Sequence, residues 1–152
     1  MYIRMTSLVH NKKAHFNYEV LETFEAGMEL FGFEVKSLRK GQGSLEGAHV
    51  TVRGGEAFLI NAHIPAYQVG NAPKDVDTRR NRRLLFTKKE IKTLTGLETQ
   101  KGLTLLPISV YNKGSKIKIE IAVARPKKKY DKRESIKKRD ADREARRTLK
   151  NQ

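Results

Sequence analysis

The chain has 152 residues, with 32 Lys and Arg against 17 Asp and Glu, and therefore carries a net charge of +15. It contains no cysteine, which excludes disulfides and thiolate metal sites and is compatible with a reducing cytoplasm. No run approaches the ~20 apolar residues of a membrane span, no apolar stretch of a signal peptide opens the chain, and no basic amphipathic segment has a continuous apolar face. We therefore expect a cytoplasmic protein that binds nucleic acid and no membrane.

The length supports one domain with an appendage. We expect residues 1–10 to be a flexible leader, residues 11–125 to form the folded body and residues 126–152 to form a basic tail. The body is long enough for one hydrophobic core and too short for two.

The body begins with apolar residues that alternate with polar ones from Phe16 to Val20, a pattern typical of a half-buried strand. Residues 34–40 then end at Gly41, a favourable residue just after the end of a short helix. In such a helix Val35 and Leu38 face the core.

The next element is a hairpin. Apolar residues alternate with polar ones over residues 50–52 and again over 58–64, and Gly54-Gly55 lies between the two runs. Pro65 ends the second strand because it cannot donate a hydrogen bond to a sheet.

Residues 66–83 are predicted to be a loop. Five cations crowd into ten of its residues and repel one another, which favours a contact with an anion over a merely solvated loop. These cations are Lys74, Arg79, Arg80, Arg82 and Arg83.

A helix start follows the loop. Thr87 and Glu90 have the spacing of a capping box, and Phe86 with Ile91 has the spacing of a hydrophobic staple. The predicted buried stripe of this helix is Ile91, Leu94 and Leu97.

A second hairpin turns at residues 112–115. On its first strand we expect Leu106, Ile108 and Val110 to share a face. On its second strand four apolar residues alternate with charged ones, namely Ile117, Ile119, Ile121 and Val123. The pattern of short antiparallel strands predicts a mainly β fold, a small OB-like antiparallel β-barrel with two or three short helices and a basic C-terminal tail.

The tail has almost nothing to bury. From Arg125 onward it holds thirteen Lys and Arg against five Asp and Glu, and its only aliphatics larger than alanine are Ile136 and Leu149. Ordering costs about 1–2 kcal/mol per residue, so we expect this segment to be disordered when free and helical on a polyanion. A solvated tail that only maintains solubility is the alternative.

Enzyme motifs are missing from the sequence. It has no phosphate-binding G-x-x-x-x-G-K-[ST] loop and no G-x-S-x-G elbow, and its four histidines show no i,i+4 spacing for zinc. We therefore expect no catalytic residue, no metal site and no cofactor, with a ribonuclease built from a lone His and Lys as the remaining enzyme alternative.

Five stretches together resemble the small protein B (SmpB) family, the bacterial partner of transfer-messenger RNA (tmRNA). They are NKKA (11–14), YEVLETFEAG (18–27), GFEVKSLRKG (32–41), DTRRNRRLL (77–85) and KKYDKRESIKKRD (128–140). They occur in order, and the similarity runs from Asn11 to the C-terminus.

The resemblance implies an OB-like barrel that grips the tRNA-like domain of tmRNA. It also implies a tail that enters the vacant decoding centre and messenger channel of a stalled ribosome and folds there into a helix. Alanine-charged tmRNA, with elongation factor Tu and GTP, would then support trans-translation, and this chain would act without catalysis, we expect as a monomer.

The resemblance also implies roles for individual residues. Those matching the RNA-facing surface of the body are Asn11, Lys12, Tyr18, Glu25, Arg80, Arg82, Arg83 and Leu85. Those matching the ribosome-binding tail are Lys127, Lys128, Tyr130, Asp131, Lys132, Arg133, Ile136, Lys137 and Arg139.

The chain departs from the usual family pattern at several positions. Thr78 stands where proline is common, Thr87 where histidine or asparagine is common, and Pro126 where glycine is common. A ribosome-associated structural RNA-binding protein that works without tmRNA is the alternative function.

Overall fold

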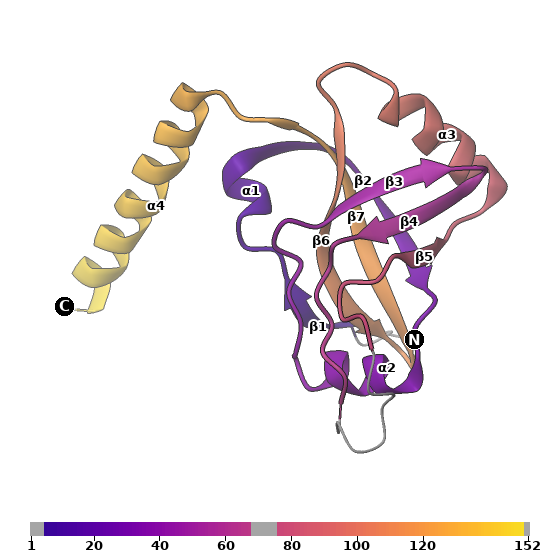
Figure 1. Ribbon diagram of the computed structural model, residues 1–152. Helices are drawn as coiled ribbons and strands as arrows, with labels where there is room; N and C mark the ends of the chain where they lie inside the picture. Colours follow the sequence, from indigo (N-terminus) through magenta and orange to yellow (C-terminus); the bar gives the residue numbers. More distant parts are fainter. Residues whose placement is uncertain (1–4, 68–75, 151–152) are drawn as a thin grey trace.

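The computed structural model describes residues 5–67 and 76–150, which form a curved antiparallel sheet, three short helices and one long helix (Figure 1). The strands are β1 (Met5–His10), β2 (Tyr18–Met28), β3 (His49–Arg53), β4 (Glu56–Ile60), β5 (Arg82–Leu85), β6 (Thr104–Lys113) and β7 (Lys116–Pro126). The helices are α1 (Ala14–Asn17), α2 (Gly32–Arg39), α3 (Lys88–Glu98) and α4 (Lys129–Lys150).

The seven strands form one sheet in the order β1-β6-β7-β2-β5-β4-β3. The sheet curls so that β3 lies against β6, while the edge strands β1 and β3 are not paired with each other in the described part of the chain. The predicted mainly β fold with short helices is therefore confirmed, and the barrel is open along one side.

The first strand corrects the predicted flexible leader. Residues 5–10 pair antiparallel with β6, from Met5 opposite Lys113 to His10 opposite Ser109. Val9 is buried in the main core and Leu8 packs against it, so apolar burial offsets the cost of ordering this segment.

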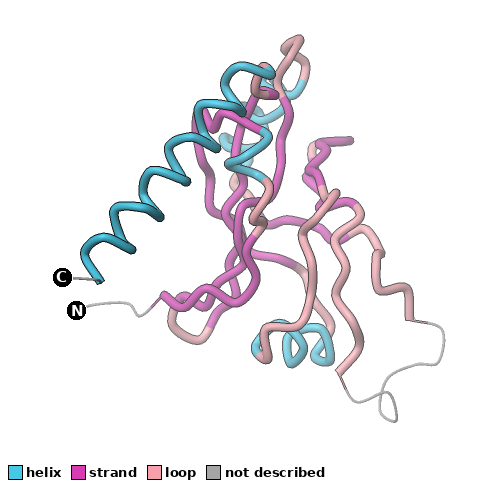
Figure 2. Tube along the Cα trace, turned by 90° about the vertical axis from the view of Figure 1, so that its left-hand side faces the viewer, coloured by secondary structure: helices cyan, strands magenta, loops and turns pink. Residues whose placement is uncertain are grey.

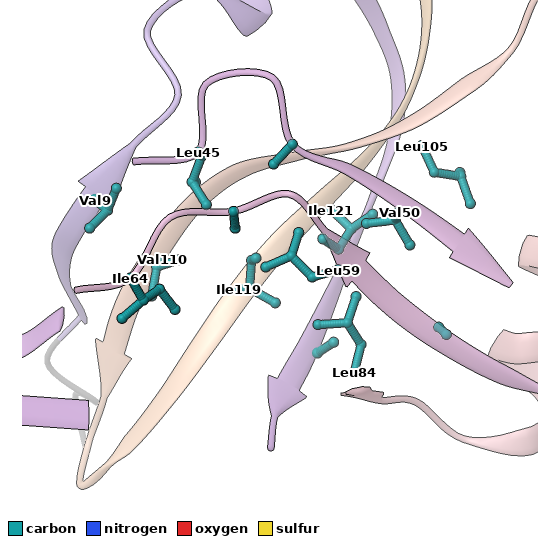
Figure 3. Close-up of a cluster of buried hydrophobic side chains, with 14 of the residues drawn as sticks. Val9, Leu45, Val50, Leu59, Ile64, Leu84, Leu105, Val110, Ile119 and Ile121 are labelled. Carbon is teal, nitrogen blue, oxygen red and sulfur yellow. The ribbon is translucent and has the colours of Figure 1, made fainter. Parts of the chain in front are cut away.

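The main core fills the concave side of the sheet (Figure 3). Leu59, Ile119 and Ile121 lie at its centre and are fully buried, with Leu84 beside them. The predicted alternation in β7 is confirmed, since Ile119, Ile121 and Val123 all face this core and Ile117 packs at its margin.

A second, smaller core lies on the other face of the sheet beneath α1. It contains Ala14 of α1, Leu106 and Ile108 of β6, and two alanines of β7. The register of β6 shifts between Pro107 and Ser109, and this bulge turns Val110 into the main core. The prediction that Val110 shares a face with Leu106 and Ile108 is therefore wrong.

The hairpin of β3 and β4 is confirmed, with His49 opposite Ile60 and Arg53 opposite Glu56. The predicted alternation of its second strand is wrong, because β4 ends at Ile60 and its inward residues are Ala57 and Leu59, not Phe58 and Ile60. Asn61 has a positive φ of 63°, which changes the side to which successive side chains point. The even-numbered residues after it, Ala62 and Ile64, therefore reach the core.

The capping box of α3 is confirmed. The Glu90 N–H donates to Thr87 Oγ1 (3.2 Å), and the Thr87 N–H donates to Glu90 Oε1 (3.0 Å). Thr87 therefore stabilises the start of α3, whose residue Leu94 is fully buried.

Helix α2 ends at Arg39, and Gly41 follows with a φ of +74°, as predicted. Leu38 faces the core, whereas Val35 is only half-buried. The buried polar residues Glu34 and Ser37 share the inner face of this helix, and no apolar pattern signalled them.

Helix α4 stands apart from the sheet, joined to it by the short extended segment after β7 (Figures 1 and 2). It spans 22 residues, and those side chains that are described are exposed. The Arg139 guanidinium of α4 lies 5.7 Å from the ring centroid of Phe16, which is in α1 and not in the strand predicted for it. Disorder of residues 126–152 in the free protein stays a prediction.

Candidate nucleic-acid interface

The buried carboxylate of Glu34 holds in place the arginine-rich segment, residues 79–83, which leads into β5. Glu34 of α2 and Arg82 of β5 are both 0% exposed, and Arg82 Nε donates to Glu34 Oε2 (2.8 Å). The other guanidinium nitrogens of Arg82 donate to the carbonyl oxygens of Ala62 (2.8 Å), Thr78 (2.8 Å) and Arg80 (3.2 Å). The guanidinium is thus surrounded by acceptors of its own chain.

A second arginine completes the group around Glu34. Arg80 donates to Glu34 Oε1 (2.5 Å), which also accepts the backbone N–H of Phe31 (2.8 Å). Burial alone would raise the pKa of Glu34, but hydrogen bonds from Arg80, from the Phe31 N–H and from Arg82 together lower it below its ordinary value. The carboxylate is therefore held charged between two cations.

This geometry corrects one predicted RNA contact. Arg82 was expected on an RNA-facing loop, but it begins strand β5 and its guanidinium is fully enclosed. Alternate residues of a strand face opposite sides, so Arg82 and Leu84 point inward while Arg83 and Leu85 point outward. Arg82 holds the segment in place and does not reach a ligand at the surface.

The neighbouring arginines do reach the surface. Arg83 is 44% exposed and pairs with Glu29 (2.9 Å) and Glu56 (3.4 Å). Arg79 is exposed, and its guanidinium donates to the Asn61 carbonyl oxygen (3.1 Å). Lys74 lies outside the described residues.

Glu25 lies at a different place, on the outer face of the sheet. Its carboxylate accepts hydrogen bonds from the Tyr111 hydroxyl and from Lys113 Nζ (3.0 Å). The bonds from Tyr111 and Lys113 lower the pKa of Glu25, while burial and the carboxylate raise the pKa of Tyr111. Glu25 thereby fixes two side chains of β6, and it lines a groove of about 520 Å³ together with Tyr111 and Glu120.

The remaining predicted contacts of the body gather near α1. The Asn11 amide donates to the Pro107 carbonyl oxygen (2.9 Å), so this side chain anchors the turn into α1. Tyr18 is half-buried against the second core, and Asn11 and Tyr18 both line a groove of about 340 Å³. Lys12 is exposed beside them.

Leu85 of β5 lines a groove that reaches the cationic turn between β6 and β7. It lies opposite Gly27 of β2 and is 48% exposed. A groove of about 350 Å³ joins it to cations that the sequence pattern did not single out as ligands, Arg39 and Lys118. They come from α2 and β7, so only the folded sheet brings them to Leu85.

In the tail, the side chains of four predicted residues are exposed on α4. They are Arg133, Ile136, Lys137 and Arg139. The side chains of Tyr130, Asp131 and Lys132 lie outside the described residues. Before the helix, the Lys127 N–H donates to the Asn17 carbonyl oxygen (2.9 Å), which ties the exit of β7 to α1, and Lys128 is exposed.

Two further properties limit the kinds of site present. Among the residues that are described, no group of three or more His, Asp or Glu side chains is placed to hold a metal ion. None of the described helices combines the length and the apolar character needed to cross a bilayer.

Comparison with known proteins identifies the family. The model of the SmpB protein family matches residues 8–151. The chain belongs to the SmpB family. It is 49% identical over 143 residues to the SsrA-binding protein of Microcystis aeruginosa, covering 94% of this chain and 93% of that one. It is 51% identical over 140 residues to the SsrA-binding protein of Caldicellulosiruptor bescii, covering 92% of this chain and 88% of that one.

A solved structure agrees with the SmpB assignment. It is described as "tmRNA-SmpB: a journey to the center of the bacterial ribosome" and superposes with a TM-score of 0.67 at 41% identity. The match covers 84% of this chain and 92% of that one. The predicted family membership is therefore confirmed over nearly the whole chain.

Proposed function

We propose that this SmpB family member binds the tRNA-like domain of tmRNA and delivers it to stalled ribosomes for trans-translation. The observation that carries the proposal is the division of the molecule into a compact body, with a cation-lined groove beside Leu85, and an exposed cationic helix. Relatives named SsrA-binding protein and the solved tmRNA-SmpB structure support the same function.

The body binds the folded RNA. Exposed Arg79 and Arg83, with Lys118 beside Leu85, are available for phosphates on either side of β5. Folded RNA is recognised by its shape, its backbone and its unstacked loop bases, and each neutralised phosphate makes the affinity depend more steeply on salt. Glu25 contributes by fixing Tyr111 and Lys113, since a carboxylate itself repels phosphate.

The tail occupies the vacant decoding site and the downstream messenger channel. A helix of 22 residues is about 33 Å long, and its described side chains bear mainly positive charge. Ribosomal phosphates would relieve the repulsion between Arg139, Arg143 and Arg147, which recur every four residues. The head of the tail, residues 130–133, then stacks on and hydrogen-bonds decoding bases in place of a codon–anticodon pair.

The partners are alanine-charged tmRNA, elongation factor Tu with GTP, and the small ribosomal subunit. The chain acts as a monomer in the cytoplasm, and the peptide chemistry belongs to the ribosome. The alternative, a ribosome-associated RNA-binding protein independent of tmRNA, has the same basic composition in its favour.

Sequencing the RNA that co-purifies with the protein tests the proposal. We expect tmRNA to be enriched over its share of total RNA, and ribosome association to fall in cells that lack tmRNA. Ribosomal RNA recovered without tmRNA enrichment, and at the same level in those cells, would favour the alternative.

A further inference from the structure

An exposed aromatic ring occupies the start of α2. Phe31 is the N-cap residue of this helix and is 53% exposed. An N-cap position favours Ser, Thr, Asp or Asn, because their side-chain oxygen accepts a backbone N–H of the first turn. Phenylalanine has no such oxygen, and its exposed ring loses the benefit of burial, so helix stability does not account for this residue.

The surroundings of the ring are cationic and fixed. The Arg80 guanidinium lies 4.3 Å from the ring centroid, and Phe33 stacks beside it with centroids 5.4 Å apart at 27°. Arg80 is itself held by Glu34 Oε1 (2.5 Å) and the Glu29 carbonyl oxygen (3.3 Å). The Arg80 guanidinium therefore lies over one face of the Phe31 ring, and the two groups form a preorganised stack, the Phe31–Arg80 platform.

We propose that the Phe31–Arg80 platform stacks an unpaired nucleobase of the RNA partner. Aromatic rings and arginine planes are the groups on which proteins stack single-stranded bases, and every base offers a face for stacking. The exposed cations of α2, Lys36 and Arg39, and Arg79 of the arginine-rich segment supply charge for the phosphates of the same strand. The inference rests on the proposed function for the identity of the RNA.

A nucleobase fits this platform better than a protein partner does. The exposed apolar surface is one ring bordered by charged side chains, whereas a peptide groove needs several apolar pockets. The other large hydrophobic residues exposed in the described ranges belong to other elements, Leu21 to β2, Leu85 to β5 and Ile136 to α4.

The substitution Phe31→Ser separates binding from folding. Serine is a favoured N-cap, and this gain offsets the loss of the ring contacts with Arg80 and Phe33, so the variant should unfold at about the same denaturant concentration as the original protein. Its affinity for tmRNA should nevertheless fall about tenfold, the typical loss when one stacking contact is removed. Phe31→Tyr, which keeps the ring, should retain the affinity, and Leu21→Ser removes an equally exposed apolar side chain as the control.

A second probe does not depend on tmRNA. A short oligoadenylate that contains 2-aminopurine loses fluorescence when its base stacks, and Phe31→Ser should reduce both this quenching and the affinity.

Unchanged affinity and quenching in Phe31→Ser would overturn the stacking inference, even where tmRNA binds the original protein. Failure of the original protein to bind tmRNA, with quenching of the oligonucleotide that depends on Phe31, would overturn the proposed function and leave the platform established. A defect of Phe31→Ser in ribosome association, with unchanged tmRNA affinity and unchanged quenching of the oligonucleotide, would assign the ring to a ribosomal contact and overturn the inference.

Discussion

The body and the tail carry the same sign of charge but place it in opposite surroundings. In the body, the Arg82 guanidinium is fully buried and its donors meet Glu34 and three backbone carbonyls. In the tail, the side chains of Arg139, Arg143 and Arg147 are exposed, and like charges recur at i,i+4. The body thus supplies a buried anion to its arginine, whereas our proposal has the tail meet the anions of a partner.

This difference separates two uses of arginine within one chain. A buried arginine with a complete set of acceptors makes the fold specific and contributes nothing to long-range attraction. An exposed series of cations stores electrostatic repulsion that a polyanion relieves. Net charge alone does not distinguish these uses, because both count equally toward +15.

The largest expected effect comes from removing the tail. Deletion of residues 127–152 should leave tmRNA binding nearly intact, because the body contacts remain, and should abolish peptide tagging in a reconstituted translation reaction. Filter binding and tagging assays on the same preparation measure the two activities. Parallel loss of both would contradict the division of labour between body and tail.

The next effect tests the buried acid of the body. Glu34→Ala leaves the Arg82 guanidinium buried without its counter-charge, which should lower the free energy of unfolding by about 3–5 kcal/mol. Glu29→Ala, which breaks the exposed pair with Arg83, should cost about 0–1 kcal/mol in the same denaturant titration. Equal costs for the two substitutions would show that burial of the pair does not matter.

The same carboxylate gives a pH dependence. Its pKa is lower in the folded protein than the ordinary value of 4.5, so its contribution is complete above that value and is lost as the pH falls through the folded pKa. Unfolding free energy should therefore decline below about pH 4.5, and the decline should be shallower in Glu34→Gln. A parallel decline in both proteins would assign the acid sensitivity to other carboxylates.

A smaller effect concerns the exposed arginine of β5. Arg83→Ala should weaken tmRNA binding several-fold and reduce the slope of log affinity against log salt by about one, because one phosphate contact is lost. Lys101→Ala removes an equally charged exposed residue beyond α3 and should leave the slope unchanged. The same slope for Arg83→Ala and the original protein would exclude Arg83 from the interface.

The smallest effect concerns the tail as an isolated peptide of residues 126–152. Circular dichroism should show mostly coil in dilute buffer. Arg143→Glu replaces two repulsive i,i+4 pairs by attractive ones, each worth about 0.2–0.5 kcal/mol, and should raise the helical signal. Arg143→Gln should fall between the two peptides. A stable helix in the unmodified peptide would mean that repulsion does not hold the tail disordered.

Local patterns predicted the elements whose signals are local. The Thr87 and Glu90 capping box, the Gly54-Gly55 hairpin and the alternation of β7 all depend on residues within a few positions of one another, and all are confirmed. The leader prediction is wrong for residues 5–10, because β1 is stabilised by a strand about a hundred residues away, which no local pattern records; residues 1–4 lie outside the described part of the chain. The bulge between Pro107 and Ser109 was not predicted for a related reason, since it changes which residues of an otherwise regular strand face the core.

The candidate site was predictable in its residue types but not in their geometry. The crowding of cations predicted a contact with an anion, and two of the arginines meet the buried acid Glu34, because repulsion between cations is relieved by a buried acid as well as by RNA. Glu34 supplies that acid to Arg80 and Arg82 from 46 and 48 residues away. Tyr111, likewise, is linked to Glu25 only through the folded sheet.

The tail leaves the body from the end of β7, a strand that is hydrogen-bonded on both sides, by β6 and by β2. The bonds of these ladders lie perpendicular to the strands. A force on α4 along the direction of β7 therefore loads the hydrogen bonds of both ladders together. A force on an edge strand, at right angles to that strand, would instead break the hydrogen bonds of one ladder one after another. Helix α4 is therefore attached to the body at a mechanically resistant point, so tension on this helix would extend it before the sheet is disrupted.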